Sequence, residues 1–314
     1  MSGETISVVV PVYKEETNID PFLERMERVL DGVGLPYEII FCLDPSPDGT
    51  YEAISRNIER NGAIRLIQFS RRFGQPAATM AGILNCVGGA CVVIDVDLQD
   101  PPELIAEMTA KWKEGYNVVY AKRRSRKGET VAKKVVAYLG YKLINSLTDV
   151  KIPTNAGDFR LIDRVVIEEL RKLNETHGFL RGLVAFVGYK QTFVEYERQE
   201  RHSGRGNYNR FLGSLRIGLN GLICFSAKPL QIMATVGFFV AAAGFLMALY
   251  YLLQKLVLSP DITPGLSSTI IFITIFSGVQ LFSIGLLGEY VSRIYDEVKN
   301  RPMYIISEIV EKKR

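Results

Sequence analysis

The chain has 314 residues with 38 basic and 34 acidic side chains, so its formal net charge is only +4. This mild charge and the absence of an RNA- or DNA-binding motif exclude nucleic acid as an expected partner. Apolar residues make up 47% of the chain, and the mean hydropathy of +0.10 is high for a soluble enzyme. The apolar excess lies near the C-terminus, so we expect a globular part and a separate apolar part.

The cysteines indicate a reducing compartment. Cys42, Cys86, Cys91 and Cys224 lie in apolar surroundings and form no C-x-x-C pair. We therefore expect reduced cysteines in the core of a cytoplasmic domain. The N-terminus leads directly into strand-like sequence, so we expect no signal peptide.

The first half of the chain alternates apolar runs with helical patterns. Residues 6–13 (ISVVVPVY) form a β-branched run typical of a strand buried on both faces of a parallel sheet. Further strands are expected at 37–43, 63–69, 91–94 and 117–121. This alternation predicts an α/β fold with a Rossmann-like, mostly parallel sheet and helices on both faces.

Polar side chains follow each expected strand at its carboxyl end. They are Tyr13, Glu15, Asp44, Asp48, Arg71, Asp95, Asp97, Arg123 and Arg124. Because ligands bind at this rim of open α/β sheets, convergent carboxylates and arginines indicate a site for phosphate and metal. Neither a G-x-G-x-x-G nor a P-loop motif occurs, which argues against a dinucleotide dehydrogenase and a P-loop NTPase.

The segment 91–103 (CVVIDVDLQDPPE) is the strongest candidate for a metal site. Asp95 and Asp97 are two residues apart, so on a regular strand they share a face. Paired carboxylates with substrate phosphates suit Mg²⁺ or Mn²⁺. The alternative is a strand-end Asx turn with solvated carboxylates.

Six segments carry a resemblance to one family. In order they are SVVVPVYKEETNI, LDPSPDGT, SRRFGQPAATMAGI, VVIDVDLQDPPE, GDFRLIDR and RHSGRGNY. The chain resembles family 2 glycosyltransferases of the GT-A fold from residue 6 to about residue 305. Within that family it resembles polyprenyl-phosphate glycosyltransferases, namely bactoprenol glucosyltransferases and dolichol-phosphate mannose synthases.

The resemblance implies roles for the matching positions. The nucleotide-sugar site would contain Pro11, Tyr13, Glu15, Asp44, Arg71, Asp95 and Asp97, and the metal site Asp95, Asp97 and Gln99. Five positions depart from the family pattern: Leu43 replaces an Asp, Pro45 a Gly, Gln75 a Lys, Gly206 a Ser and Asn207 a Lys.

The resemblance also places Asp158, Asp97 and Arg201 in the catalytic centre. Asp158 lies between an expected loop and an expected helix, so a helix cap is the structural alternative. A hydroxyl acceptor would need Asp158 as a general base, whereas a lipid phosphate is already ionised and needs only positioning. The sequence leaves these roles open.

Basic side chains gather in the middle of the chain. We expect Arg123, Arg124, Arg201 and Arg205 to bind the lipid phosphate or the donor diphosphate. The segment 122–134 is either a solvated loop or a lid over an anionic acceptor. A helix is expected from about Val131 to Leu147. His202 is isolated and is expected to be structural.

The C-terminal part indicates a membrane hairpin. After a catalytic domain over 1–207, we expect an interfacial amphipathic helix at 208–228 and two spans within 229–290. The spans run from about 230 to 253 and from 266 to 287, each long enough for about 30 Å of hydrocarbon. A buried core hairpin is the alternative.

Basic residues flank both outer ends of the hairpin, so the positive-inside rule places the catalytic domain and both termini in the cytoplasm. The tail, 291–314, has strand character, and we expect it to pair with a neighbouring subunit's sheet and form a homo-oligomer.

Together with these observations, the resemblance implies a metal-dependent, inverting transfer of a hexose to polyprenyl (undecaprenyl) phosphate at the cytoplasmic membrane face. Resemblance to the glucosyl branch of the family implies UDP-glucose as the donor. GDP-mannose is the rival donor. A processive polysaccharide synthase would need a Q-x-x-R-W motif, and the single Trp, Trp112, lacks it. A non-catalytic membrane subunit would leave Asp95, Asp97 and Asp158 unexplained.

Overall fold

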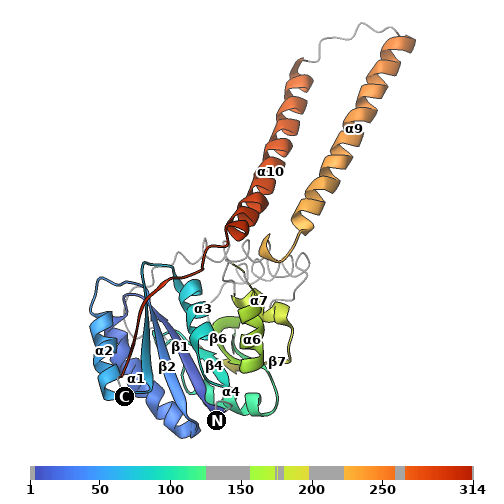
Figure 1. The fold of residues 1–314 in the computed structure, drawn as a ribbon. Helices are drawn as coiled ribbons and strands as arrows, with labels where there is room; N and C mark the ends of the chain where they lie inside the picture. The colour runs from blue at the N-terminus through green and yellow to red at the C-terminus, as the bar shows by residue number, and fades with distance from the viewer. Residues whose placement is uncertain are drawn as a thin grey trace.

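The computed structural model describes residues 4–124, 156–173, 175, 180–197, 223–258 and 266–312. Its strands are β1 (Ile6–Val12), β2 (Tyr37–Leu43), β3 (Ile64–Phe69), β4 (Ala90–Val93), β5 (Val118–Arg123), β6 (Ala156–Asp163), β7 (Gln191–Tyr196) and β8 (Ile306–Glu311). Its helices are α1 (Glu16–Val33), α2 (Thr50–Arg60), α3 (Gln75–Asn85), α4 (Leu104–Lys113), α6 (Arg164–Lys172), α7 (Leu180–Val187), α9 (Lys228–Leu258) and α10 (Leu266–Lys299). Figure 1 shows a sheet covered by helices, from which α9 and α10 project as a hairpin.

The strands form one sheet in the order β7-β5-β6-β4-β1-β2-β3-β8. Strands β1 to β4 are parallel, as predicted, because each is followed by a helix that returns the chain to the same edge. Strand β6 lies between β4 and β5 and runs antiparallel to both. The sheet is therefore mixed.

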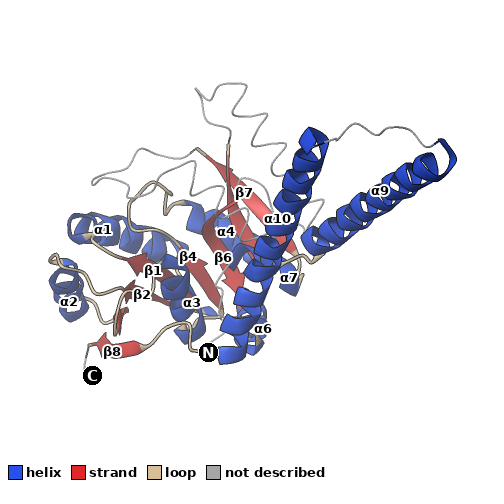
Figure 2. Cartoon of the chain, turned by 90° about the horizontal axis from the view of Figure 1, so that it is seen from above, coloured by secondary structure: helices blue, strands red, loops and turns tan. Residues whose placement is uncertain are grey.

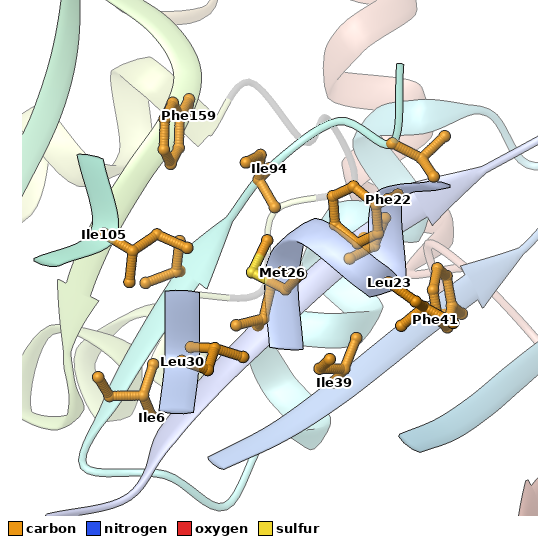
Figure 3. Close-up of a cluster of buried hydrophobic side chains, with 14 of the residues drawn as sticks. Ile6, Phe22, Leu23, Met26, Leu30, Ile39, Phe41, Ile94, Ile105 and Phe159 are labelled. Carbon is orange, nitrogen blue, oxygen red and sulfur yellow. The ribbon is translucent and has the colours of Figure 1, made fainter. Parts of the chain in front are cut away.

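Alternation along the central strands builds two cores. On β1, the side chains of Val8 and Val10 face α1, α2 and α4, whereas Val9 faces α3, α6 and α7. This period of two is what a strand buried on both faces requires. Figure 3 shows the first core, where Phe22 and Met26 of α1 lie over the sheet. Full burial of such a side chain contributes about 1.5–3 kcal/mol.

The cysteines agree with the prediction of reduced core thiols. Cys42, Cys86 and Cys91 are buried, and all four cysteines are free, although Cys224 is only partly buried.

Two helical glycines test how tightly α3 packs on the sheet. A Cβ added at Gly82 would lie 2.2 Å from Cγ1 of Val9 and 2.9 Å from Sγ of Cys42, whereas at Gly32 of α1 nothing lies within 4 Å. We expect Gly82→Ala to lower the free energy of unfolding by about 1–3 kcal/mol through overpacking. Gly32→Ala should raise it by about 0.5–1 kcal/mol through helix propensity. Urea unfolding of both variants checks the opposite signs, and a stabilised Gly82→Ala protein would contradict this packing.

The two C-terminal helices are longer than the predicted spans. They contain segments apolar and long enough to cross a membrane, Lys228–Met247 and Ile275–Lys299, and neither segment is buried. Large apolar side chains point outward, including Phe245 and Leu281 at 70% exposure. The exposure of these side chains excludes the alternative of a buried core hairpin.

The C-terminal tail forms a strand, as predicted, but its partner is different. Strand β8 pairs antiparallel with β3 of its own chain. Figure 2 shows the C-terminus at β8, on the same side of the domain as α2. The prediction that this tail pairs with a neighbouring subunit is therefore wrong. The tail is long enough to return from α10 and cover the open edge of β3.

Candidate active site

The hydrogen-bond ladder between β1 and β4 ends at Pro11. The N–H of Ile94 donates to the Val9 carbonyl at 3.1 Å. The next bond of a parallel ladder would need an N–H at residue 11, and Pro11 has none. Strand β4 therefore ends, and the chain turns at Asp95. Pro11 itself is buried in β1, opposite Cys42 of β2.

Asp97 lies in a turn rather than on a strand. Strand β4 ends at Val93, so the prediction that Asp95 and Asp97 share a strand face is wrong. The N–H of Gln99 donates to Oδ1 of Asp97 at 3.2 Å, which closes the Asx turn named as the alternative. Asp97 is nevertheless only 9% exposed, unlike a solvated carboxylate.

The backbone of this turn is strained at Leu98. Leu98 has a φ of 57°, in the left-handed region, which costs a non-glycine residue about 1–3 kcal/mol. Its side chain is buried in the core on the α1 side of the sheet, and this packing holds the turn in place. The position of Asp97 is thus fixed by the core and not by local propensity.

The loop between β3 and α3 connects to both acidic segments. Asp44 accepts hydrogen bonds from the N–H groups of Phe73 and Gly74, both at 2.9 Å, and is 3% exposed. Gln75, at the start of α3, donates from Nε2 to Oδ1 of Asp95 at 2.8 Å. Asp44 therefore fixes the loop, and its predicted contact with the nucleotide stays a prediction. Gln75 occupies the family's lysine position and orients Asp95.

Aromatic and arginine side chains stack along the same loop. The guanidinium of Arg72 lies 4.0 Å from the ring centre of Tyr13, and that of Arg71 lies 4.0 Å from the ring centre of Phe73. The sequence reading selected Arg71 and missed Arg72. The contact with Arg72 holds the Tyr13 ring at the rim. An aromatic ring at this position is suited to stacking on a nucleotide base.

Hydrogen bonds join the loops after β1 and β2. Asp48 accepts from the hydroxyl of Thr50 at 2.7 Å and from Ser46, and the Thr50 hydroxyl accepts from the N–H of Glu15 at 3.1 Å. Burial raises the pKa of Asp48, but the hydrogen bonds from Ser46 and Thr50 outweigh it and the pKa is lowered. Glu15 also accepts from Nδ2 of Asn18 at 2.5 Å. This network fixes the predicted Glu15 beside Tyr13.

Asp158 lies on β6, between Gly157 and Phe159, and not at a helix start. The helix cap is instead Asp163, whose carboxylate accepts from the N–H of Val165. The alternation of Phe159 and Leu161 with polar neighbours is the period-two signal that identifies this strand. The cap interpretation of Asp158 is therefore wrong.

Asp158 is held by a guanidinium that the sequence reading missed. Arg181, on α7, donates to Oδ1 at 2.8 Å from Nε and to Oδ2 at 3.2 Å from Nη2. Arg160, also on β6, is 4% exposed and lies 4.0 Å from Oδ1. Burial raises the pKa of Asp158, but the charge and hydrogen bonds of Arg181 outweigh it and the pKa is lowered. Burial likewise lowers the pKa of Arg160 to about 10, so this side chain is still charged at neutral pH.

Arg123, the last residue of β5, and Arg124, which follows it, both form ion pairs. Nη2 of Arg123 lies 3.6 Å from Asp100, and its Nε donates to the hydroxyl of Tyr196 at 3.0 Å. Arg124 is more exposed and lies 3.4 Å from Glu195. Burial raises the pKa of Tyr196, and the charge of Asp100 adds to this effect. Tyr196 is therefore a neutral donor to Asp100.

Some predicted features lie outside the described residues. These are Arg201, Arg205, His202, most of the basic segment 122–134, the helix at 131–147 and most of the amphipathic helix at 208–228. Among the residues that are described, no three His, Cys, Asp or Glu side chains gather closely enough to hold a metal ion by themselves. Asp95 and Asp97 still fit Mg²⁺ or Mn²⁺, because these ions are usually held by one or two carboxylates with substrate phosphates.

Comparisons with known proteins cover nearly the whole chain. The Glycosyl transferase family 2 profile matches residues 7–171, and the GtrB C-terminal hairpin profile matches residues 228–294. The uncharacterized glycosyltransferase YkcC of Bacillus subtilis is 45% identical over 310 residues, which are 98% of this chain and 95% of YkcC. The SfII prophage-derived bactoprenol glucosyl transferase of Shigella flexneri is 38% identical over 301 residues, 96% of this chain and 97% of the relative.

The fold also matches solved glycosyltransferase structures. Glucosyl-3-phosphoglycerate synthase of Mycobacterium tuberculosis, crystallised with Mn²⁺, UDP and phosphoglyceric acid, superposes with a TM-score of 0.51 at 20% identity. The match covers 71% of this chain and 78% of the synthase and concerns the fold. Together with the profile and the full-length relatives, the shared fold leads to one conclusion. The chain belongs to the family 2 glycosyltransferases, has the GT-A fold and carries a GtrB-type C-terminal hairpin.

Proposed function

We propose that this protein transfers glucose from UDP-glucose to polyprenyl phosphate at the cytoplasmic face of a membrane, with inversion at the anomeric carbon. The full-length relatives named bactoprenol glucosyl transferases support the sugar and the lipid class of acceptor. The acidic and arginine-rich rim supports a nucleotide diphosphate as donor.

One observation carries the proposal: the apolar hairpin is attached at the same edge of the sheet as the acidic turn. Helix α10 ends at Lys299, and the N–H of Ser70, directly after β3, donates to the carbonyl of Ile305 at 3.0 Å. Strands β1 to β4 are parallel, so their carboxyl ends share this edge with Asp95 and Asp97. Figure 1 shows the hairpin leaving the domain on the side opposite the N-terminal end of β1. A lipid acceptor held by the hairpin would therefore meet a donor held at the rim.

On the donor side, the chain supplies binding and orientation. Tyr13 would stack on the base, and Arg71 would contact the diphosphate. Asp95, Asp97 and Gln99 would hold Mg²⁺ or Mn²⁺, which would neutralise charge on the departing nucleoside diphosphate. Gln75 would orient the Asp95 carboxylate through the hydrogen bond from its Nε2 to Oδ1.

On the acceptor side, a phosphate oxygen would attack the anomeric carbon from the face opposite the leaving group. Arg123 and Arg124 at the end of β5, with Arg201 and Arg205, would bind the lipid phosphate or the diphosphate. Holding both reactants in line supplies the rate enhancement expected of proximity and orientation. Basic residues at the outer ends of the hairpin favour the cytoplasmic orientation.

A donor screen tests this proposal. The full-length protein in detergent or vesicles is incubated with undecaprenyl phosphate, Mg²⁺ or Mn²⁺, and labelled UDP-glucose, UDP-GlcNAc or GDP-mannose. We expect label in the lipid fraction with UDP-glucose. Transfer only from GDP-mannose would assign the mannosyl reaction instead. No transfer from any donor would overturn the enzymatic proposal.

Gln75 offers a test of the metal site that spares its ligands. Removing a side chain that orients a metal ligand typically weakens metal affinity about 10–100-fold. We therefore expect Gln75→Ala to raise the Mn²⁺ concentration for half-maximal activity by that factor, with little change at saturating metal. Gln75→Lys restores the residue usual in the family and should retain activity. An unchanged metal requirement in Gln75→Ala would show that the contact with Asp95 has no such role.

A further inference from the structure

Asp158 carries a negative charge where the proposed reaction brings an anionic acceptor. Its side chain is 39% exposed and is not sealed in the core. Arg160 pairs with Val93 at the end of β4, and β6 is antiparallel to β4, so Asp158 lies beyond this pair on the side of the acidic turn. Two like charges repel each other, and they do so more strongly in a partly desolvated site than in water. A bare carboxylate here would therefore oppose the approach of a phosphate, and its charge needs compensation.

Arg181 provides this compensation with a defined geometry. Its Nε and Nη2 atoms donate to the two different oxygens of Asp158, at 2.8 and 3.2 Å. A planar guanidinium that contacts both oxygens fixes the carboxylate plane, which a single hydrogen bond does not. Helix α7, which carries Arg181, is anchored by the buried side chains of Leu180, Leu183 and Val184. The clamp therefore comes from a rigid element.

Other positive charges support the same carboxylate from behind. Arg160 lies 4.0 Å away on β6 and donates from Nη2 to the Gly157 carbonyl at 2.8 Å. Arg123, from β5, also acts on Asp158 electrostatically. With three guanidinium groups around it, Asp158 is poorly suited to accept a proton.

We infer that Arg181 is a positioning residue of the transfer reaction: it clamps Asp158 as an ionised, immobile carboxylate beside the acceptor, and Asp158 is not the general base. This inference rests on the proposed function, in which the attacking phosphate has already lost its proton. The sequence left a general base and a positioning group as alternatives, and the clamp selects positioning.

The test compares Arg181→Gln with Arg181→Lys in full-length protein. For Arg181→Gln we expect kcat to fall about 100-fold, the loss typical of a reacting geometry displaced by about 1 Å. The KM for the nucleotide sugar should stay within about twofold, because the clamp acts on the acceptor side. Lysine keeps the charge but not the paired contact, so Arg181→Lys should recover part of kcat.

The pH profile distinguishes positioning from general support of the fold. In the wild type the pKa of Asp158 is lowered, because Arg181 outweighs the effect of burial. Without Arg181, the effect of burial prevails and the pKa of Asp158 rises. The acid limb of the kcat profile should therefore move to higher pH. A loss of kcat with an unshifted acid limb, or a normal kcat in Arg181→Gln, would overturn the inference.

Stability gives a measurement that does not depend on the acceptor. The lowered pKa of Asp158 contributes stability above the unfolded pKa of about 3.9, and this contribution is lost as pH falls through the lower folded value. The Tm deficit of Arg181→Gln should therefore be larger at pH 7 than at about pH 2, well below the unfolded pKa. Arg171→Gln is the matched control, because Arg171 pairs with Glu168 on α6.

The two measurements separate the failure of each proposal. A Tm deficit that does not change with pH would overturn the clamp even if glucose transfer is observed. If the wild type transfers no sugar to undecaprenyl phosphate, the proposed function fails, while the Tm comparison still decides whether Arg181 holds Asp158 ionised.

Discussion

Asp97→Ala is expected to lower sugar transfer at least about 10³-fold while the protein stays folded. A divalent ion supplies several kcal/mol of charge stabilisation in such reactions, and each 1.36 kcal/mol corresponds to a tenfold change in rate. Asp97 is fixed for this role, because it lies in a buried turn whose backbone is strained at Leu98. The measurement is transfer of labelled glucose to undecaprenyl phosphate at saturating Mg²⁺ or Mn²⁺.

A matched substitution separates this effect from damage to the fold. Asp31→Ala changes an exposed carboxylate near the far end of α1, away from the rim, and should leave transfer unchanged. Both variants should keep a Tm close to that of the wild type, because the buried side chain of Leu98 anchors the turn whether or not residue 97 accepts the hydrogen bond from Gln99. Near-normal transfer by a folded Asp97→Ala protein would rule out Asp97 as a metal ligand.

Ending the chain after Asn300 should lower the Tm of the catalytic domain by about 10 °C. The truncation removes β8 together with Tyr304, whose ring lies 5.9 Å from that of Phe69, and Val310, which packs on the core. The loss should be at least that of one large core side chain, about 3–5 kcal/mol, and each kcal/mol shifts Tm by about 2–4 °C in domains of this size. Thermal unfolding followed by circular dichroism measures the change.

The same truncation should weaken donor binding. Phe69 contacts Phe73 at 6.1 Å between ring centres, and Phe73 belongs to the loop that carries Arg71. Removing Tyr304 loosens this aromatic stack, so the KM for the nucleotide sugar should rise at temperatures where the truncated protein is folded. A truncated protein with wild-type Tm and KM would show that β8 does not support the sheet or the loop.

A cysteine pair checks that β8 belongs to its own chain. Gln68 and Glu308 are opposite each other in the β3–β8 register, within the reach of a disulfide. Gln68→Cys combined with Glu308→Cys should give an oxidised monomer on non-reducing gels. A covalent dimer would instead support exchange of the tail between subunits. The tail pairs within its own chain and so gives no support to the predicted homo-oligomer, which stays a prediction.

The order of apolar runs was enough to predict the parallel half of the sheet. Strands β1 and β2 are buried on both faces, and such strands contain little except apolar residues. Strand β3 is buried except at Arg65 and Gln68. The loops after them carry the acidic and arginine side chains, and parallel strands must bring these loops to one edge. The rim, with Asp95, Asp97 and Arg71, was therefore predictable.

Strand β6 was missed because its interior positions mix charge with apolar side chains. Asp158 and Arg160 alternate with Phe159 and Leu161, and the segment was interpreted as a loop before a helix. Arg181 lies 23 residues beyond Asp158, and no spacing rule joins a strand residue to a helix residue at that separation. Such pairs form only when the sheet and α7 pack together.

By itself, the sequence determined the alternation of strands and helices, the acidic rim and the apolar hairpin, because each depends on local composition and period. Tertiary structure alone decided that β6 enters the sheet antiparallel, that Arg181 clamps Asp158 and that β8 returns to β3. The physical reason is the same in each case. Once the local elements have formed, an open sheet edge, an unpaired buried charge or an uncovered apolar face can be satisfied only by a segment distant in the sequence.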